Sequence, residues 1–144
     1  MTDPADLGPL AERMVRETPQ AAALGIELVE VGRGAGTLRL PYRADLVGDP
    51  ATGVLAGGVI TTLLDHVCGL AVASLGREGS TATLDLRIDY MRAAEPGLDV
   101  TARAACDKVT RSVAFVRGVA FDRDESDPVA TVQAAFVLNR SATP

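Results

Sequence analysis

A long apolar run, Gly53–Ser74, most constrains how this chain can fold, because it holds one carboxylate, Asp65, among apolar side chains. Its apolar residues cover most of the circumference of a helix beginning near Ala56 or Gly57, which is typical of a buried helix. An ionised carboxylate in such surroundings costs several kcal/mol in desolvation unless partners compensate it. Asp65 is therefore either a structural carboxylate that holds the helix in register or a group positioned for chemistry.

The segment Val54–Leu75 is also long enough to span a bilayer. Asp65 and His66 would then lie near the bilayer centre, where a charge costs roughly 2.5 to 3.5 kcal/mol on insertion scales. The flanking segments have the patterns of soluble strands. We therefore expect a soluble protein with no membrane partner.

Six segments have the patterns of β-strands. They are Gly25–Val31, Ala35–Tyr42, Thr81–Met91, Leu98–Cys106, Ser112–Phe121 and Val129–Leu138. The residues of the third strand that alternation predicts to face a core are Leu84, Leu86, Ile88 and Tyr90. The last two strands alternate less strictly, which favours central positions in the sheet.

The order of these elements predicts the fold. A short helix over about residues 5–18 ends before Pro19, and two strands, the long helix and four more strands follow. Short turns make the last four strands antiparallel, so the sheet must curl around the one helix to bury it. This α+β arrangement, an antiparallel sheet of about six strands wrapped around one long central helix, is the hotdog fold.

Composition narrows the function further. With 144 residues, 47% of them hydrophobic, residues 1–144 are expected to form a single domain. The net charge of −5 argues against nucleic acid as a partner. Cys68 and Cys106 lack zinc-ligand spacing, and we interpret both as reduced core residues. The acidic N-terminal segment lacks the basic residues followed by an apolar stretch that are typical of a signal peptide, which predicts a cytoplasmic location.

Three motifs resemble those of one enzyme family. They are G-x-x-x-G-G at 53–58, L-x-D at 63–65 and D-x-R-I-x-Y-x-R at 85–92, and a loop rich in Asp, Gly and Pro precedes the long helix. Over roughly residues 20–140, the chain resembles the hotdog acyl-CoA thioesterases of the phenylacetate-degradation (PaaI) type. The resemblance implies hydrolysis of an acyl-CoA thioester to a free acid and CoA, with no cofactor other than the CoA of the substrate.

The resemblance also implies roles for four residues. The aspartate matching Asp65 is a nucleophile or general base. The backbone N–H of Gly57 forms the oxyanion hole, with that of Gly58 as a second candidate. A hydroxyl at Thr83 lies near the thioester or the attacking water. A helix N-terminus suits an oxyanion hole on physical grounds, since it offers unpaired N–H groups and the positive end of the helix dipole. Thr83 is equally interpretable as an ordinary polar strand residue.

The spacing of Gly57 and Asp65 predicts a shared site. Eight residues span about 12 Å along a helix at 1.5 Å per residue, too far for both to contact one carbonyl carbon. The simplest solution is a two-fold homodimer in which Gly57 of one subunit meets Asp65 of the other. In the family that the chain resembles, such dimers commonly pair again into homotetramers.

Candidates for contacts with CoA lie on the later strands and turns. Arg92, Lys108 and Arg111 are candidates for its phosphates, and Tyr90 for its pantetheine or adenine. Each basic residue taken singly fits solvated surface charge at least as well.

The chain departs from the family pattern at two positions. Ala56 stands where many members have histidine, and Pro50, beside Asp49, falls where they have a loop asparagine. These losses leave an alternative open, a non-catalytic acyl or acyl-CoA binding hotdog domain. The catalytic histidine and helical glutamate of the hotdog dehydratases are also absent from the matching positions.

Other catalytic schemes are disfavoured. The chain has no G-x-S-x-G motif, no P-loop and no H-E-x-x-H motif. His66 is the only histidine, so no multi-histidine metal site or redox cofactor is expected. We interpret His66 as a core or interface residue, because adjacent helix positions point in different directions and it forms no simple dyad with Asp65.

Overall fold

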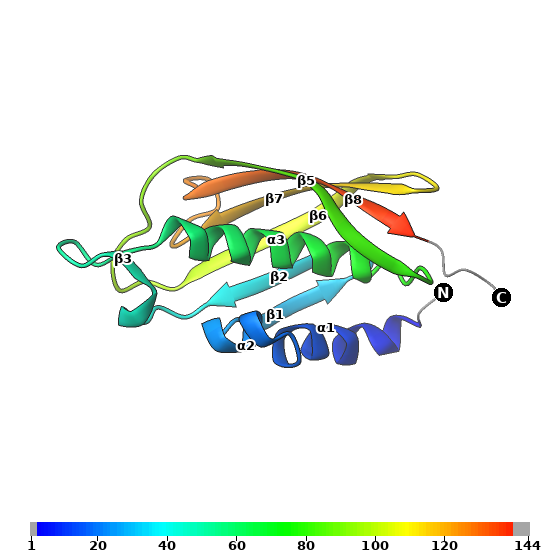
Figure 1. Cartoon of the computed structure of the whole chain (residues 1–144), viewed down its shortest axis with the longest axis horizontal. Helices are drawn as coiled ribbons and strands as arrows, with labels where there is room; N and C mark the ends of the chain where they lie inside the picture. The colour runs from blue at the N-terminus through cyan, green and yellow to red at the C-terminus, as the bar shows by residue number, and fades with distance from the viewer. Residues whose placement is uncertain (1–2, 140–144) are drawn as a thin grey trace.

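A six-stranded antiparallel sheet curves over one long helix in the computed structural model of the protein (Figure 1). The structure describes residues 3–139. The strands lie in the order β1 (Glu27–Gly32), β2 (Ala35–Leu40), β6 (Val100–Val109), β7 (Val113–Phe121), β8 (Ala130–Asn139) and β5 (Ser80–Tyr90). This is the predicted hotdog arrangement. β7 is central as expected, and β8 lies between β7 and the edge strand β5.

The long helix is α3 (Gly57–Ala73), which begins at one of the two residues predicted for its start. Its fully buried side chains include Leu63, Leu64, Val67 and Leu70. A second stripe, spaced three or four residues apart, keeps partial or full exposure; it consists of Gly58, Thr62, Asp65 and Gly69. The sheet therefore covers α3 on most sides but leaves open the side that carries Asp65.

From residue 3 to the first strand, the structure has two α-helices rather than the one expected. α1 (Leu7–Arg16) follows a single 3₁₀ turn at Pro4–Asp6, and α2 (Pro19–Leu24) begins directly at the proline that was predicted only to end a helix. Proline is well suited to the first turn of a helix, because its missing N–H would have no partner there. α2 ends at Gly25, whose φ of 74° is the left-handed conformation common after a helix.

β5 is an edge strand, and this corrects one expectation. Leu86 and Ile88 pack against the core, but Leu84 is 59% exposed and Tyr90 is 51% exposed. A bulge between Thr83 and Asp85 interrupts the alternation near Leu84. Tyr90 faces the first turn of α3, but at the end of the strand it stays half exposed. The exposed Leu84, Tyr90 and Met91 give this edge an apolar surface.

The opposite edge of the sheet is β1, which has a different character. A bulge between Leu28 and Glu30 breaks its register with β2, and Glu30 is exposed. α1 packs beside it in Figure 1. The hairpin to β2 turns at Gly34, which has a φ of 73°.

The predicted loop before α3 contains short regular elements. A 3₁₀ turn at Ala44–Leu46 leads into β3 (Val47–Asp49), which pairs with β4 (Val54–Leu55) in a separate antiparallel ladder. Among residues 3–139, no helix has the length and apolar character needed to cross a membrane.

Candidate active site

Asp65 and Thr83 meet on the open side of α3. The hydroxyl of Thr83 donates a hydrogen bond of 2.9 Å to Oδ1 of Asp65. Asp65 is only partly buried and Thr83 is exposed, so both are accessible from the β5 edge. Within the described part of the chain, Oδ2 of Asp65 has no hydrogen-bond donor. The sequence-predicted pair thus forms one site, with a carboxylate oxygen left available for a substrate or a water molecule.

The N-terminus of α3 is uncapped and open. Ala56, at the N-cap position, provides no side-chain hydrogen bond. Gly57 and Gly58 are exposed, and neither has a positive φ. A Cβ atom at Gly58 would meet nothing within 4 Å, and one at Gly57 would meet only the Tyr90 ring, at 3.9 Å. Packing within the chain therefore does not require these glycines, whereas the close approach of a ligand to the first amides of the helix would.

Tyr90 contacts the first turn of α3. Its hydroxyl donates to the carbonyl oxygen of Gly57 at 2.9 Å, and Thr61 donates to the same oxygen at 3.2 Å. The two hydroxyls also contact each other. Thr61 was not among the predicted site residues, although its position four residues after Gly57 places it one helical turn further on.

A cavity of about 280 Å³ adjoins this helix end. Its lining includes Gly57, Ile60, Tyr90, Met91 and Val129, so its walls are mostly apolar. A larger hollow of about 610 Å³ lies on the far face of the sheet among charged residues such as Arg87 and Asp107, away from Gly57 and Asp65. Of these two, the smaller cavity adjoins the helix N-terminus and has room for a group bound there.

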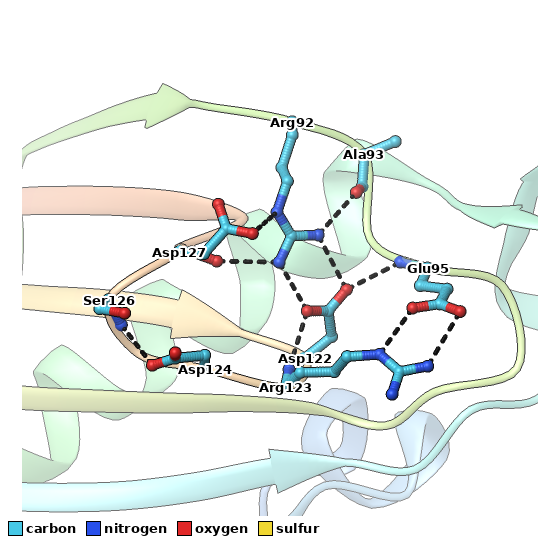
Figure 2. A network of polar contacts seen from close by, with 8 residues as sticks. All are labelled: Arg92, Ala93, Glu95, Asp122, Arg123, Asp124, Ser126 and Asp127. Atoms are coloured by element: carbon cyan, nitrogen blue, oxygen red, sulfur yellow. Dashed lines mark hydrogen bonds and ion pairs between the residues drawn. The ribbon is translucent and has the colours of Figure 1, made fainter.

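Arg92 is held in a polar network rather than presented to solvent (Figure 2). Its guanidinium donates to both oxygens of Asp122, at 2.6 and 2.9 Å, and pairs with Asp127 at 3.3 Å. The Asp122 side chain is 1% exposed. The hydrogen bonds from Arg92 hold the pKa of the Asp122 carboxyl well below its usual range, and the backbone N–H groups of Glu95 and Arg123 contribute in the same direction.

The network joins the segment after β5 to the turn between β7 and β8. Arg123 donates to both carboxylate oxygens of Glu95, at 2.8 and 3.0 Å, beside the Arg92 cluster (Figure 2). Arg92 is thus paired with carboxylates of its own chain. This favours a structural role for Arg92 over the predicted contact with CoA.

Lys108 and Arg111 lie at the other end of the molecule from Gly57. They are exposed residues at the β6–β7 hairpin, which Figure 1 shows near the C-terminal end of α3. There Arg77 donates to the carbonyl of Thr110 at 2.9 Å. A single chain therefore does not bring Lys108 or Arg111 to Gly57.

Two further residues near Asp65 have structural contacts. Nε2 of His66 lies 2.9 Å from the carbonyl oxygen of Met14, which ties α1 to α3. Cys68 is a buried free thiol, and burial raises its pKa to about 12, with the Asp65 charge adding to the effect. Cys106 is also free and is partly buried.

The loop position next to Pro50 is occupied by a turn-forming aspartate. Oδ1 of Asp49 accepts the backbone N–H of Ala51 at 3.0 Å, and Oδ2 accepts the Thr52 hydroxyl at 2.9 Å. Both oxygens are thus used within the turn. Within residues 3–139, no group of three or more His, Cys, Asp or Glu side chains could hold a metal ion.

A family model described as "Thioesterase superfamily" matches residues 52–129, which run from the turn between β3 and β4 to the residue before β8. Among curated proteins, the medium/long-chain acyl-CoA thioesterase YigI of Escherichia coli is 28% identical over 143 residues, covering 90% of this chain and 91% of YigI.

Two solved structures are also similar. A Pseudomonas aeruginosa protein is 40% identical with a TM-score of 0.83, and the match covers 92% of this chain and 99% of that one. A mutant of the phenylacetic acid degradation protein PaaI from Thermus thermophilus is 26% identical with a TM-score of 0.75, covering 84% and 99% of the two chains.

Proposed function

Because this chain belongs to the thioesterase superfamily and is a thioester hydrolase, we propose that its substrate is an acyl-CoA and that two copies of the chain share each active site. The observation that carries the proposal is the placement of an open, uncapped helix start and a partly exposed carboxylate on one helix, eight residues apart.

The substrate class is supported by the site and by the relatives. The apolar cavity beside Gly57 suits an acyl group, and the uncapped amides suit a thioester carbonyl. YigI acts on medium- and long-chain acyl-CoA, as its name states. Lys108 and Arg111 remain our candidates for the CoA phosphates, since Arg92 is paired within the chain.

The free edge of β5 supports the shared site. Within one chain, Tyr90 is bonded to Gly57 near one end of β5, and Thr83 is bonded to Asp65 near the other. A second copy can pair antiparallel along β5 with Arg87 opposite the Arg87 of the first copy. In this register Leu86 of one copy lies opposite Ile88 of the other, so residues that face the core are paired with each other. The bulge before Asp85 takes up one residue, so Thr83 of one copy lies opposite Tyr90 of the other.

This pairing places each carboxylate beside the helix start of the other copy. It also sets the hairpin end of one chain, with Lys108 and Arg111, toward the Gly57 end of its mate. The exposed apolar residues of β5 would be buried in the same step.

The reaction proceeds by addition of water to the thioester. Oδ2 of Asp65 takes a proton from a water molecule while the water oxygen bonds to the carbonyl carbon of the thioester. The helix amides of the other copy stabilise the resulting oxyanion. The C–S bond then breaks, and the CoA sulfur leaves with the proton. If Asp65 instead attacks the carbon itself, the C–S bond breaks, the CoA thiolate leaves and a mixed anhydride forms between Asp65 and the acyl group. Water that attacks the Asp65 carbonyl of this anhydride leaves its oxygen in the aspartate, so ¹⁸O found in Asp65 after a single turnover in labelled water identifies the nucleophilic route.

The test is thiol release from a panel of short-chain, medium-chain and aromatic acyl-CoAs, with an Asp65→Asn variant as the control. Release that depends on Asp65 supports the proposal. If no thiol is released while CoA raises the melting temperature, the chain binds acyl-CoA without hydrolysing it, and the proposal fails.

A further inference from the structure

The peptide group between Gly57 and Gly58 is restrained from an unusual direction. Its carbonyl oxygen is bonded by the hydroxyls of Tyr90, at 2.9 Å, and Thr61, at 3.2 Å. The Tyr90 ring also packs against Gly57, because its Cε1 and Cζ atoms lie 3.9 and 4.0 Å from where a Cβ atom would be. Tyr90, the last residue of β5, thus contacts the first residue of α3 through both its hydroxyl and its ring.

We propose that Tyr90 is a positioning residue that orients and polarises the N–H of Gly58, the second of the two helix-start amides assigned to the oxyanion hole, an inference that rests on the proposed thioesterase function. A trans peptide fixes its C=O and N–H groups in one plane, pointing in opposite directions. A hydroxyl that holds the Gly57 carbonyl therefore also aims the Gly58 N–H. Hydrogen bonding at the carbonyl strengthens the N–H as a donor, because hydrogen bonds in a chain polarise one another.

The local sequence explains why such a restraint matters. Two successive glycines give the helix start more backbone freedom than any other residue pair, and Ala56 adds no side-chain cap. An oxyanion donor is effective only when it is fixed before the reaction begins. The Tyr90 hydroxyl, which comes from β5, holds this peptide in place by its carbonyl and leaves the N–H on the other side of the peptide open.

This role differs from the contact with CoA predicted for Tyr90 from the sequence. The hydroxyl is already engaged with Gly57 and Thr61, on the carbonyl side of the peptide. Its removal should therefore act on the chemical step, in which charge develops on the carbonyl oxygen of the substrate, and should leave the binding of CoA itself unchanged.

The experiment compares Tyr90→Phe with Tyr42→Phe. Tyr42 is a matched control, because its hydroxyl also donates to a backbone carbonyl, that of Gly53 at 2.7 Å, away from the helix amides. For each variant we measure kcat, KM, the melting temperature and the Kd of an acyl-CoA thioether, which lacks the carbonyl oxygen.

We expect Tyr90→Phe to lower kcat about tenfold and to leave the Kd of the thioether unchanged, because Thr61 still holds the carbonyl and only the transition state is affected. Both variants should lower the melting temperature by a similar amount, a few degrees, because each loses one hydrogen bond. Tyr42→Phe should nevertheless keep kcat within about twofold of the wild type. The amide proton resonance of Gly58 should shift in Tyr90→Phe and stay in place in Tyr42→Phe, which is a readout that needs no substrate.

Two results overturn the inference while thioesterase activity stands. One is a wild-type kcat in Tyr90→Phe with an unmoved Gly58 resonance. The other is weaker binding of the thioether with an unchanged kcat, which would make Tyr90 a CoA contact. If the wild type itself releases no thiol from any acyl-CoA, the proposed function fails, and the Gly58 resonance alone decides whether Tyr90 polarises this amide.

Discussion

Thr83 donates a hydrogen bond of 2.9 Å to Asp65 and so connects the edge strand β5 to the middle of α3. The bond uses one oxygen of the carboxylate and leaves the other accessible. It also fixes the side chain, so that the accessible oxygen points in a constant direction. An aspartate held in this way suits proton transfer better than it suits packing.

Asp65→Asn should therefore remove activity and keep the fold. The amide can still accept the Thr83 hydrogen bond, but it cannot take a proton from water. We expect kcat to fall by about 10² to 10⁴, the usual contribution of a general base, with a melting temperature within a few degrees of the wild type. Thiol-release assays measure kcat, and thermal unfolding measures the melting temperature. Wild-type turnover in this variant would remove Asp65 from the mechanism.

Mixing two inactive variants tests whether the site is shared. Asp65→Asn lacks the carboxylate, and Gly58→Val blocks the helix start. If each site takes one part from each chain, a mixed dimer has one intact site, so unfolding and refolding an equal mixture should restore about a quarter of wild-type activity. A site contained in one chain would give no recovery, which makes the outcome decisive.

The glycines of the chain should respond differently to alanine. At Gly58 a methyl group has open space, so Gly58→Ala should keep or slightly raise stability and lower turnover by crowding the thioester. At Gly118 a Cβ atom would lie 2.7 Å from the carbonyl oxygen of Arg103, so Gly118→Ala should cost about 1 to 3 kcal/mol of unfolding free energy. Urea unfolding and thiol release separate the two cases. Full activity in Gly58→Ala would mean that the thioester does not dock there.

A lysine on the free edge should separate the subunits. Leu84 is 59% exposed, so Leu84→Lys leaves the core intact but places a charge where a second copy would pair. We expect a smaller mass by light scattering, together with lost activity and an unchanged circular dichroism spectrum. Val29→Lys is the control, since Val29 is similarly exposed, at 51%, on the opposite edge strand. Equal effects of the two lysines would contradict pairing through β5.

The Arg92–Asp122 pair should make stability depend on acid. The pKa of Asp122 is lowered in the folded protein. The pair therefore stabilises the fold at pH values above the ordinary carboxyl pKa of about 3.9, and this stabilisation is lost as the pH falls toward the lowered pKa. Asp122→Asn should cost about 1 to 3 kcal/mol at pH 7, and its deficit should shrink below about pH 4. Urea titrations at several pH values measure it.

Asp45→Asn serves as the control for this prediction. Its carboxylate pairs with Arg43 at 3.0 Å, but the side chain is 69% exposed. An exposed pair contributes little, so this variant should be close to the wild type at every pH. A constant deficit for Asp122→Asn across the range would show that charge is not the cause.

Periodicity predicted the elements that are defined by their own residues. The start of α3, the strand pattern and the antiparallel order follow from spacing and short turns, and they match the structure. The expectation of a core position for Leu84 was wrong, because alternation does not reveal the bulge that interrupts it. Tyr90 does face α3, but at the end of an edge strand it stays half exposed. Pro19 was interpreted as a stop, although the same residue is favoured at a helix start.

Contacts between distant residues were not predictable from one sequence. Arg92 and Asp122 are far apart in the chain, and only the fold of the intervening strands brings them together. The position of Lys108 and Arg111 at the far end of the sheet likewise depends on topology. The roles of Asp65, Gly57, Gly58 and Thr83 stay predictions, although the hydrogen bond from Thr83 to Asp65 agrees with them.

The two margins of the sheet differ, and this difference limits how far the sheet can extend from one chain to the next. If β5 joins β5, the outer strands of the joined sheet are two copies of β1. Each of these is kinked by its bulge at Leu28–Glu30 and carries the exposed Glu30. Such a margin discourages the addition of another strand, so end-to-end growth stops at a closed pair and does not continue into a fibre.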